Sequence, residues 1–205
     1  MIKYIDYVPV EPDLKMIMAR LGYRSSSTIL SPVDKEKLSK GIKEGLLLCE
    51  PKGVYRILNV TQRDKDKVVL EDDVVLVSEK LSMLLKDSVK VIMMSATVGK
   101  EVVDRAALEV KSGDGALGVI LDAVASEAAD SVLDWIMKFM DNTLIREGQK
   151  LTSHRFSAGY GDFLLHHQKI FYDTLDLGKL GISITESFML VPEKSVTAIA
   201  GIERR

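Results

Sequence analysis

Apolar residues recur at steps of three and four along residues 117–140, which is the longest helical pattern in the chain. Asp122, Asp130 and Asp134 fall outside this apolar stripe. Such spacing gathers apolar side chains on one face of a helix and leaves charged ones on the other. The sequence therefore predicts a long amphipathic helix that packs on a core. The stripe consists of Leu117, Leu121, Val124, Ala128, Val132, Trp135 and Phe139.

Helical and strand patterns alternate along the rest of the chain. Ser31-Pro32 and Ser78 are helix-start signals, and β-branched residues mark strands. Because the order has no regular strand–helix–strand rhythm, it predicts an α+β fold in a single domain spanning residues 1–205. The short strands 68–70 and 74–77 are expected to form a hairpin. We expect helices over 12–21, 34–48, 79–86, 101–110 and 162–177, and strands over 54–60, 68–70, 74–77, 89–96, 182–191 and 195–200.

The composition narrows the classes of function. The 205 residues are 46% hydrophobic and 28% charged, with a formal net charge of -2 at pH 7. A nearly neutral chain has no excess of basic residues to attract nucleic acid. No apolar run reaches the roughly 18 residues that a membrane span needs. The single cysteine, Cys49, cannot form an internal disulfide, and its leucine-rich surroundings predict a buried, unreactive thiol. We expect a cytoplasmic protein that binds neither nucleic acid nor membrane.

Two patterns that often mark reactive sites are better explained as structure. Residues 113–118 match G-x-G-x-x-G, but a helical pattern precedes them instead of the strand that a dinucleotide site needs. His166 and His167 are adjacent, so on a helix their side chains diverge by about 100°, and His154 has no cysteine or acid at ligand spacing. No serine or cysteine lies in a nucleophile-elbow context. The sequence therefore predicts no metal site and no catalytic residue.

The segment 152–162, between the two C-terminal helical patterns, is richer in binding chemistry. Gly159 and Gly161 let a backbone approach a ligand closely, and Arg155 offers a planar fork that suits a carboxylate. Tyr160 can stack and form a hydrogen bond at once. Taken alone, the segment fits either a loop that binds a small anion or a plain structural turn.

Several blocks of sequence, in the same order and at similar spacing, resemble the activation domain of cobalamin-dependent methionine synthase. The blocks fall within residues 117–202, whereas residues 1–116 are too diverged to align. The family usually has a proline on each side of the small residue in the loop, where this chain has Phe156 and Ala158, and a tyrosine beyond the S-V strand has no counterpart. The matching blocks are Ser126-Glu127-Ala128, the R-x-x-x-G-Y loop Arg155–Tyr160, Thr185-Glu186-Ser187-Phe188, Pro192 and Ser195-Val196.

The resemblance implies a mixed or antiparallel sheet with long helices and a site for S-adenosylmethionine. Arg155 would pair with the carboxylate of the ligand's methionine part, and the backbones of Ser157 and Gly159 would contact the ligand. Tyr160 would line the pocket, and Glu127 would offer negative charge to the ligand's cationic side. Glu127 also lies at the border of the apolar helical stripe, where a carboxylate could face a cleft.

The resemblance further implies a component of a split methionine synthase, rather than a complete enzyme. The cobalamin would be carried by a partner polypeptide that lacks its own activation domain, and a flavodoxin-like or other one-electron donor would supply the electron for reductive methylation. Two alternatives remain open at this point. One is a non-catalytic adaptor that docks onto a corrinoid protein, and the other is an independent enzyme that uses the same cleft for another anionic metabolite.

Overall fold

An antiparallel sheet forms the centre of the protein, and the computed structural model describes residues 1–23 and 29–205. Its strands lie in the order β4-β3-β2-β5-β9-β6. The first strand, β1, pairs with residues 53–56 of β2, and β3 pairs with residues 60–63 further along the same edge. A separate hairpin consists of β7, Ser183–Ile184, and β8, Leu190–Val191. The sheet strands are β1 Ile2–Ile5, β2 Lys52–Arg63, β3 Lys67–Leu70, β4 Val74–Val77, β5 Lys90–Thr97, β6 Gln149–Leu151 and β9 Ser195–Arg204.

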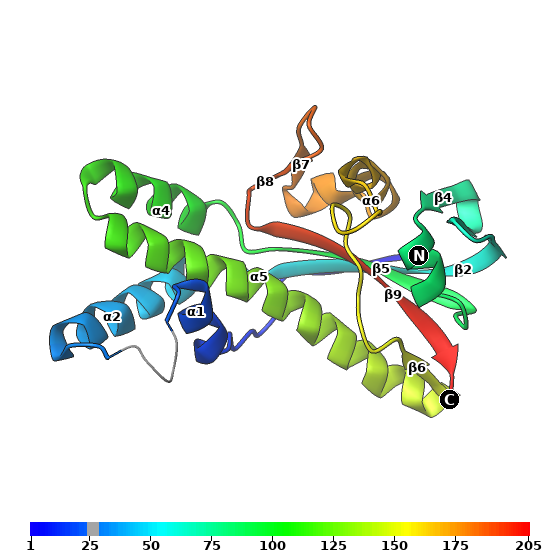
Figure 1. Ribbon diagram of the computed structural model, residues 1–205, viewed down its shortest axis with the longest axis horizontal. Coiled ribbons are helices and arrows are strands. Elements are labelled where there is room, and N and C mark those ends of the chain that lie inside the picture. Colours follow the sequence, from blue (N-terminus) through cyan, green and yellow to red (C-terminus); the bar gives the residue numbers. More distant parts are fainter. Residues whose placement is uncertain (24–28) are drawn as a thin grey trace.

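The helices lie on both faces of the sheet (Figure 1). The longest, α5, has its C-terminal half against one face, and α2 and α4 flank its N-terminal half to form a helical arm. Helix α6 and the β7–β8 hairpin lie on the opposite face. The helices are α1 Leu14–Arg20, α2 Pro32–Leu48, α3 Glu79–Leu84, α4 Glu101–Ser112, α5 Gly115–Leu144 and α6 Gln168–Thr174.

Alternation along β5 supplies both halves of the core. Successive side chains of a strand point to opposite faces, so Val91 and Met93 pack in the cluster that includes Phe163 and Phe171 of the α6 side. Ile92 and Met94 pack in a second cluster with Val132, Leu133, Ile136 and Met140 of α5. Because both faces of β5 are covered, residues 91–97 are all buried, and Val91 to Met94 form an uninterrupted apolar run.

Glycines allow the helices of the arm to approach α5 closely. A Cβ added at Gly45 of α2 would lie 3.0 Å from Val124 Cγ1, and one at Gly118 of α5 would lie 2.9 Å from the carbonyl oxygen of Ala106 in α4. The turn between α4 and α5 is the G-x-G-x-x-G segment, where Gly113 ends α4 with φ 102° and Asp114 caps α5. This segment is a helix–helix turn, as predicted.

The α+β class and most of the predicted elements are confirmed. The predicted helix 117–140 lies within α5, and Ser31 and Ser78 cap α2 and α3 through hydrogen bonds from Asp34 and Leu81 N–H groups. The sheet is antiparallel throughout its described pairings. The strands β1 and β6 were not predicted. Among the described residues, no helix combines the length and hydropathy needed to cross a bilayer.

Several elements are a few residues longer or shorter than predicted, and two differ from the prediction in kind. The helix expected over 162–177 begins only at Gln168, because the Asp162 carboxylate accepts hydrogen bonds from the Ser78 hydroxyl and the Glu79 N–H and so ties its own segment to the start of α3. The strand expected over 182–191 is the β7–β8 hairpin. It reverses at residues 185–188, where Phe188 has φ 64° and the Met189 N–H donates to Thr185 Oγ1.

The single thiol is less buried than expected. Cys49 is half-buried at the end of α2, beside the cluster that includes Val98 and Val102. Burial nevertheless raises the pKa of the Cys49 thiol to about 12, so the thiol stays protonated at neutral pH. The predicted lack of reactivity therefore has a physical basis in the structure.

Candidate functional site

The loop that carries Arg155 is held against the edge of β9. Phe156 and Ile199 exchange two backbone hydrogen bonds of 2.8 Å, and the Phe156 ring stacks on Phe163 at 6.0 Å between centroids. Since neighbouring residues of an extended segment point to opposite sides, Phe156 packs in the α6-side cluster while Arg155 reaches towards α5. The backbone pairing of a hydrophobic residue thus positions the arginine.

The glycines of the loop form a tight reversal. Gly159 has φ 92° and Gly161 has φ 59°, a region that residues with a Cβ rarely adopt. The Gly159 N–H donates to the Phe163 carbonyl at 2.7 Å, and the Phe163 N–H donates to the Tyr160 carbonyl at 3.0 Å. This reversal leaves the Tyr160 side chain 69% exposed. The aromatic ring is therefore available as a contact surface beside Arg155.

Two aspartates of α5 pair with Arg155. One guanidinium nitrogen bonds the Asp134 carboxylate, and Nη2 lies 3.5 Å from Asp130 Oδ1. Asp130 and Asp134 lie one turn apart, so both project from the same face of α5. The second contact is at the outer limit of hydrogen-bond length and is correspondingly weak.

Glu127 lies one turn earlier on α5 and pairs with an arginine from α1. Its side chain is 8% exposed, and Glu127 Oε2 is 3.0 Å from Arg20 Nε. Burial raises the pKa of the Glu127 carboxyl, against the opposing effect of Arg20. Arg20 Nη2 also lies 2.5 Å from Asp130 Oδ2. Acids and arginines therefore alternate in one connected series of ion pairs, Glu127–Arg20–Asp130–Arg155–Asp134.

Arg20 was missed in the sequence, where it is only a basic residue in the last turn of a short helix. No local pattern relates it to Glu127, which is 107 positions away. The acidic residues of α5 near Arg20 and Arg155 did carry a signal. Glu127, Asp130 and Asp134 are spaced by three and four, which gathers three acids on one helix face and calls for basic partners.

Two cavities meet at Arg155. The first, about 140 Å³, contains three of the predicted site residues, Arg155, Ser157 and Tyr160. The second, about 380 Å³, shares Arg155 with the first and is lined by Asp134, Met137, Ser153, His154 and Arg155. The first is lined by Asp130, Leu133, Arg155, Ser157, Ala158, Tyr160, Gln168, Ser195, Val196 and Thr197.

The two remaining predicted site residues lie beside this cavity. Gly159 lies in sequence between lining residues Ala158 and Tyr160, and Glu127 lies one turn before the lining residue Asp130 on α5. The Ser195-Val196 block of the sequence resemblance also reaches the cavity, whereas residues 185–188 form the hairpin turn. Gln168, at the start of α6, accepts a 2.6 Å hydrogen bond from the Thr197 hydroxyl on the cavity wall. The structure thus brings together the loop, the first turn of α6, β9 and α5.

The adjacent histidines are arranged differently from the prediction. Their rings stack with centroids 4.2 Å apart, although His166 and His167 lie in a 3-10 turn, where successive side chains leave the axis about 120° apart. His167 Nε2 accepts from the Val77 N–H at 3.1 Å, so its Nδ1 carries the proton and donates to the Leu164 carbonyl at 2.9 Å. Both ring nitrogens of His167 are therefore used in structural hydrogen bonds.

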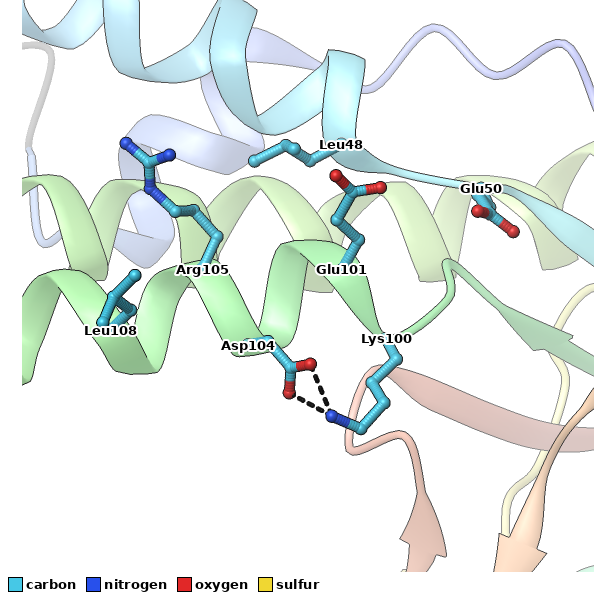
Figure 2. A pocket seen from close by; sticks show the side chains of 7 residues that line it. All are labelled: Leu48, Glu50, Lys100, Glu101, Asp104, Arg105 and Leu108. Carbon is cyan, nitrogen blue, oxygen red and sulfur yellow. Dashed lines mark hydrogen bonds and ion pairs between the residues drawn. The ribbon is translucent and has the colours of Figure 1, made fainter.

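A further cavity of about 590 Å³ lies far from the loop, on the helical arm between the end of α2 and α4 (Figure 2). Its wall carries Glu50, Glu101 and Asp104, and Lys100 donates to Asp104 Oδ1 at 2.5 Å. Lys100 and Asp104 are an exposed i,i+4 pair, which is ordinary for a helix surface. This cavity gathers no group with unusual chemistry.

Comparison with known proteins supports the fold. No protein-family model and no curated protein sequence matches the chain. The structure is similar to the crystal structure of the MetH reactivation domain bound to AdoHcy (S-adenosylhomocysteine), with a TM-score of 0.72 and 16% sequence identity. The similarity covers 98% of this chain and 78% of that chain. The chain therefore has the α+β fold of the methionine synthase reactivation domain, which is the fold that the sequence resemblance predicted.

Proposed function

We propose that this chain binds S-adenosylmethionine beside Arg155 and acts as the reactivation component of a split cobalamin-dependent methionine synthase. The observation that carries the proposal is the position of the R-x-x-x-G-Y loop. Arg155, Ser157 and Tyr160 of this loop line one cavity, in a fold whose solved relative is bound to AdoHcy.

The side chains around the cavity suit the parts of such a ligand. Arg155 presents a guanidinium fork that can bind a carboxylate through two hydrogen bonds, and the exposed ring of Tyr160 can stack on a flat base. The backbone of Ser157 and Gly159 runs along the site without bulky side chains. Glu127 and its neighbours on α5 supply negative charge for the cationic side of the ligand.

The protein's task in this proposal is positioning. The corrinoid, bound to a separate polypeptide that lacks its own activation domain, supplies the nucleophile, and a flavodoxin-like or other one-electron donor supplies the electron. Arg155 and Tyr160 hold the ligand so that its methyl group faces the partner. Fixing two reactants in line contributes to the rate through orientation, so the chain needs no acid–base residue of its own. A cytoplasmic location would bring these partners together.

The size of the cavity requires the site to open. A pocket for a ligand of this size typically measures about 300–1,000 Å³, whereas the cavity lined by Ser157 and Tyr160 measures about 140 Å³. Arg155 lines both this cavity and the neighbouring one of about 380 Å³. If Arg155 turns towards a ligand carboxylate, the two spaces join, and the exposed pair with Asp134 opposes this motion by only about 0–1 kcal/mol.

A second candidate function follows from the same observation. A small cavity with Arg155 already paired also fits a non-catalytic adaptor that retains the fold for docking onto a corrinoid protein. The two functions differ in ligand binding. Isothermal titration calorimetry of the purified chain with S-adenosylmethionine and S-adenosylhomocysteine, without cobalamin, should give saturable heat under the first proposal. An absence of saturation at millimolar ligand favours the adaptor.

The reactivation role has its own test. A methionine synthase truncated before its activation domain, with its corrinoid in the oxidised, inactive state, is mixed with this chain, S-adenosylmethionine and a one-electron donor. The visible spectrum should report recovery of the methylated corrinoid, and Arg155→Ala should abolish the recovery. Recovery without this chain, or no recovery with a cognate partner, contradicts the role.

A further inference from the structure

The cavity beside the loop contains two opposite charges. Among its lining residues the charged ones are Arg155 and Asp130, and Arg155 Nη2 is 3.5 Å from Asp130 Oδ1. The other polar walls are neutral, and Gln168 and Thr197 already bond each other at 2.6 Å. Any ionic recognition within this cavity therefore falls to one guanidinium and one carboxylate that face each other.

Glu127 is less accessible to a ligand than Asp130. Glu127 is buried, its Oε2 is held by Arg20 Nε at 3.0 Å, and it is not among the residues that line the cavity. The side chain of Asp130 is 38% exposed, and it lines the cavity with one oxygen towards Arg155 while Arg20 holds the other. A cationic group that enters the cavity meets Asp130 first.

We propose that Asp130 binds the α-ammonium group of the ligand, and that Asp130 and Arg155 together select an α-amino-acid end. This inference rests on the proposed function. The α-carbon of an amino acid carries its ammonium and carboxylate side by side, and Asp130 and Arg155 present the complementary charges side by side. Insertion of the ligand replaces the long Arg155–Asp130 contact and the surface Arg155–Asp134 pair by charge-assisted hydrogen bonds from Arg155 to the ligand carboxylate and from the ligand ammonium to Asp130.

Arg20 fixes Asp130 for this role. Its Nη2 bonds Asp130 Oδ2 at 2.5 Å, and this contact does not involve the oxygen that faces Arg155. When the ligand displaces Arg155 from Asp130, the carboxylate keeps Arg20 as a partner and its orientation. Two contacts of Arg155 must yield, the 3.5 Å one to Asp130, which is at the limit of hydrogen-bond length, and the surface pair with Asp134, and each costs little.

The inference is tested with two ligands and one variant. Calorimetry compares S-adenosylhomocysteine with the analogue in which hydrogen replaces the α-amino group and the carboxylate is retained. A lost charge-assisted contact corresponds to about 10- to 150-fold in affinity, so the wild-type chain should bind the deaminated analogue more weakly by that factor. Asp130→Asn should weaken binding of S-adenosylhomocysteine by the same factor and should bind the two ligands nearly equally.

Asp122→Asn is the matched control. Asp122 lies on the same helix with an exposed side chain that pairs with Lys194 at 2.7 Å, and neither residue lines the cavity. This variant should retain wild-type discrimination. Thermal melting of Asp130→Asn checks that the loss of the Arg20 contact leaves the chain folded. The comparison of the two ligands on the wild-type chain needs no variant and stands if Asp130→Asn does not fold.

The outcomes separate this inference from the proposed function. If the wild-type chain binds neither ligand, the proposed function itself is wrong. If it binds S-adenosylhomocysteine and the deaminated analogue equally well, the protein binds the ligand without recognising its ammonium group, and the proposed role of Asp130 is wrong. A folded Asp130→Asn chain that still discriminates assigns the ammonium to another carboxylate and also overturns the inference.

Discussion

Arg155 should bind the carboxylate of S-adenosylhomocysteine in competition with Asp134. A charge-assisted pair contributes about 1.5–3 kcal/mol, so Arg155→Ala should weaken binding by about 10- to 150-fold. Arg155→Lys keeps the charge but loses the fork, and its affinity should fall between the two. The Asp134 side chain is 66% exposed, and an exposed pair contributes about 0–1 kcal/mol. Asp134→Asn frees Arg155 and should tighten binding by up to about fivefold.

Isothermal titration calorimetry at constant ionic strength measures all three variants, and thermal melting confirms that each is folded. Opposite signs for Arg155→Ala and Asp134→Asn are the expected signature of competition for one guanidinium. Wild-type affinity in a folded Arg155→Ala chain refutes the carboxylate role of the arginine. Weaker binding by Asp134→Asn refutes the competition, because it makes Asp134 a contributor to the site.

Three further predictions concern stability. Gly118→Ala places a Cβ 2.9 Å from the Ala106 carbonyl and should lower stability to urea by about 1–3 kcal/mol; an unchanged midpoint contradicts the tight α4–α5 packing. Burial lowers the pKa of His167, so the unfolded chain binds more protons and the free energy of unfolding should fall as pH drops below about 6.5. His167→Gln should reduce this dependence on pH, measured by urea titrations. Arg20→Ala leaves Glu127 buried without its partner and should lower the free energy of unfolding by about 1–3 kcal/mol at pH 7. This loss should shrink in acid as Glu127 gains a proton. The same loss at every pH contradicts the prediction.

Local pattern determined the elements that are long and amphipathic. The three- and four-residue spacing in 117–140 predicted α5, and Ser31 and Ser78 marked the starts of α2 and α3. These features are visible in the sequence because the responsible residues are near neighbours, and each helix or cap forms from contacts within a few positions. The α+β class followed from the order of the same elements.

Short elements depended on distant partners. The strands β1 and β6 comprise Ile2–Ile5 and Gln149–Leu151, and unlike β3 and β4 they have no partner strand next to them in sequence. They form by pairing with edges of β2 and β9 that lie about 50 positions further along the chain. Asp162 lies in a segment with helical spacing, yet its carboxylate bonds the start of α3 and the helix begins later. In both cases hydrogen bonds across the fold override a local preference.

The candidate site divides in the same way. The sequence by itself indicated the loop with Arg155 and Tyr160 and the acid Glu127, through their residue types and their resemblance to a known motif. Only the tertiary structure placed Arg20 between Glu127 and Asp130 and set Asp130 opposite Arg155 in one cavity. The physical reason is that ionic contacts depend on distances of a few ångströms in space, and folding brings α1 within such distances of α5 across more than a hundred positions of sequence.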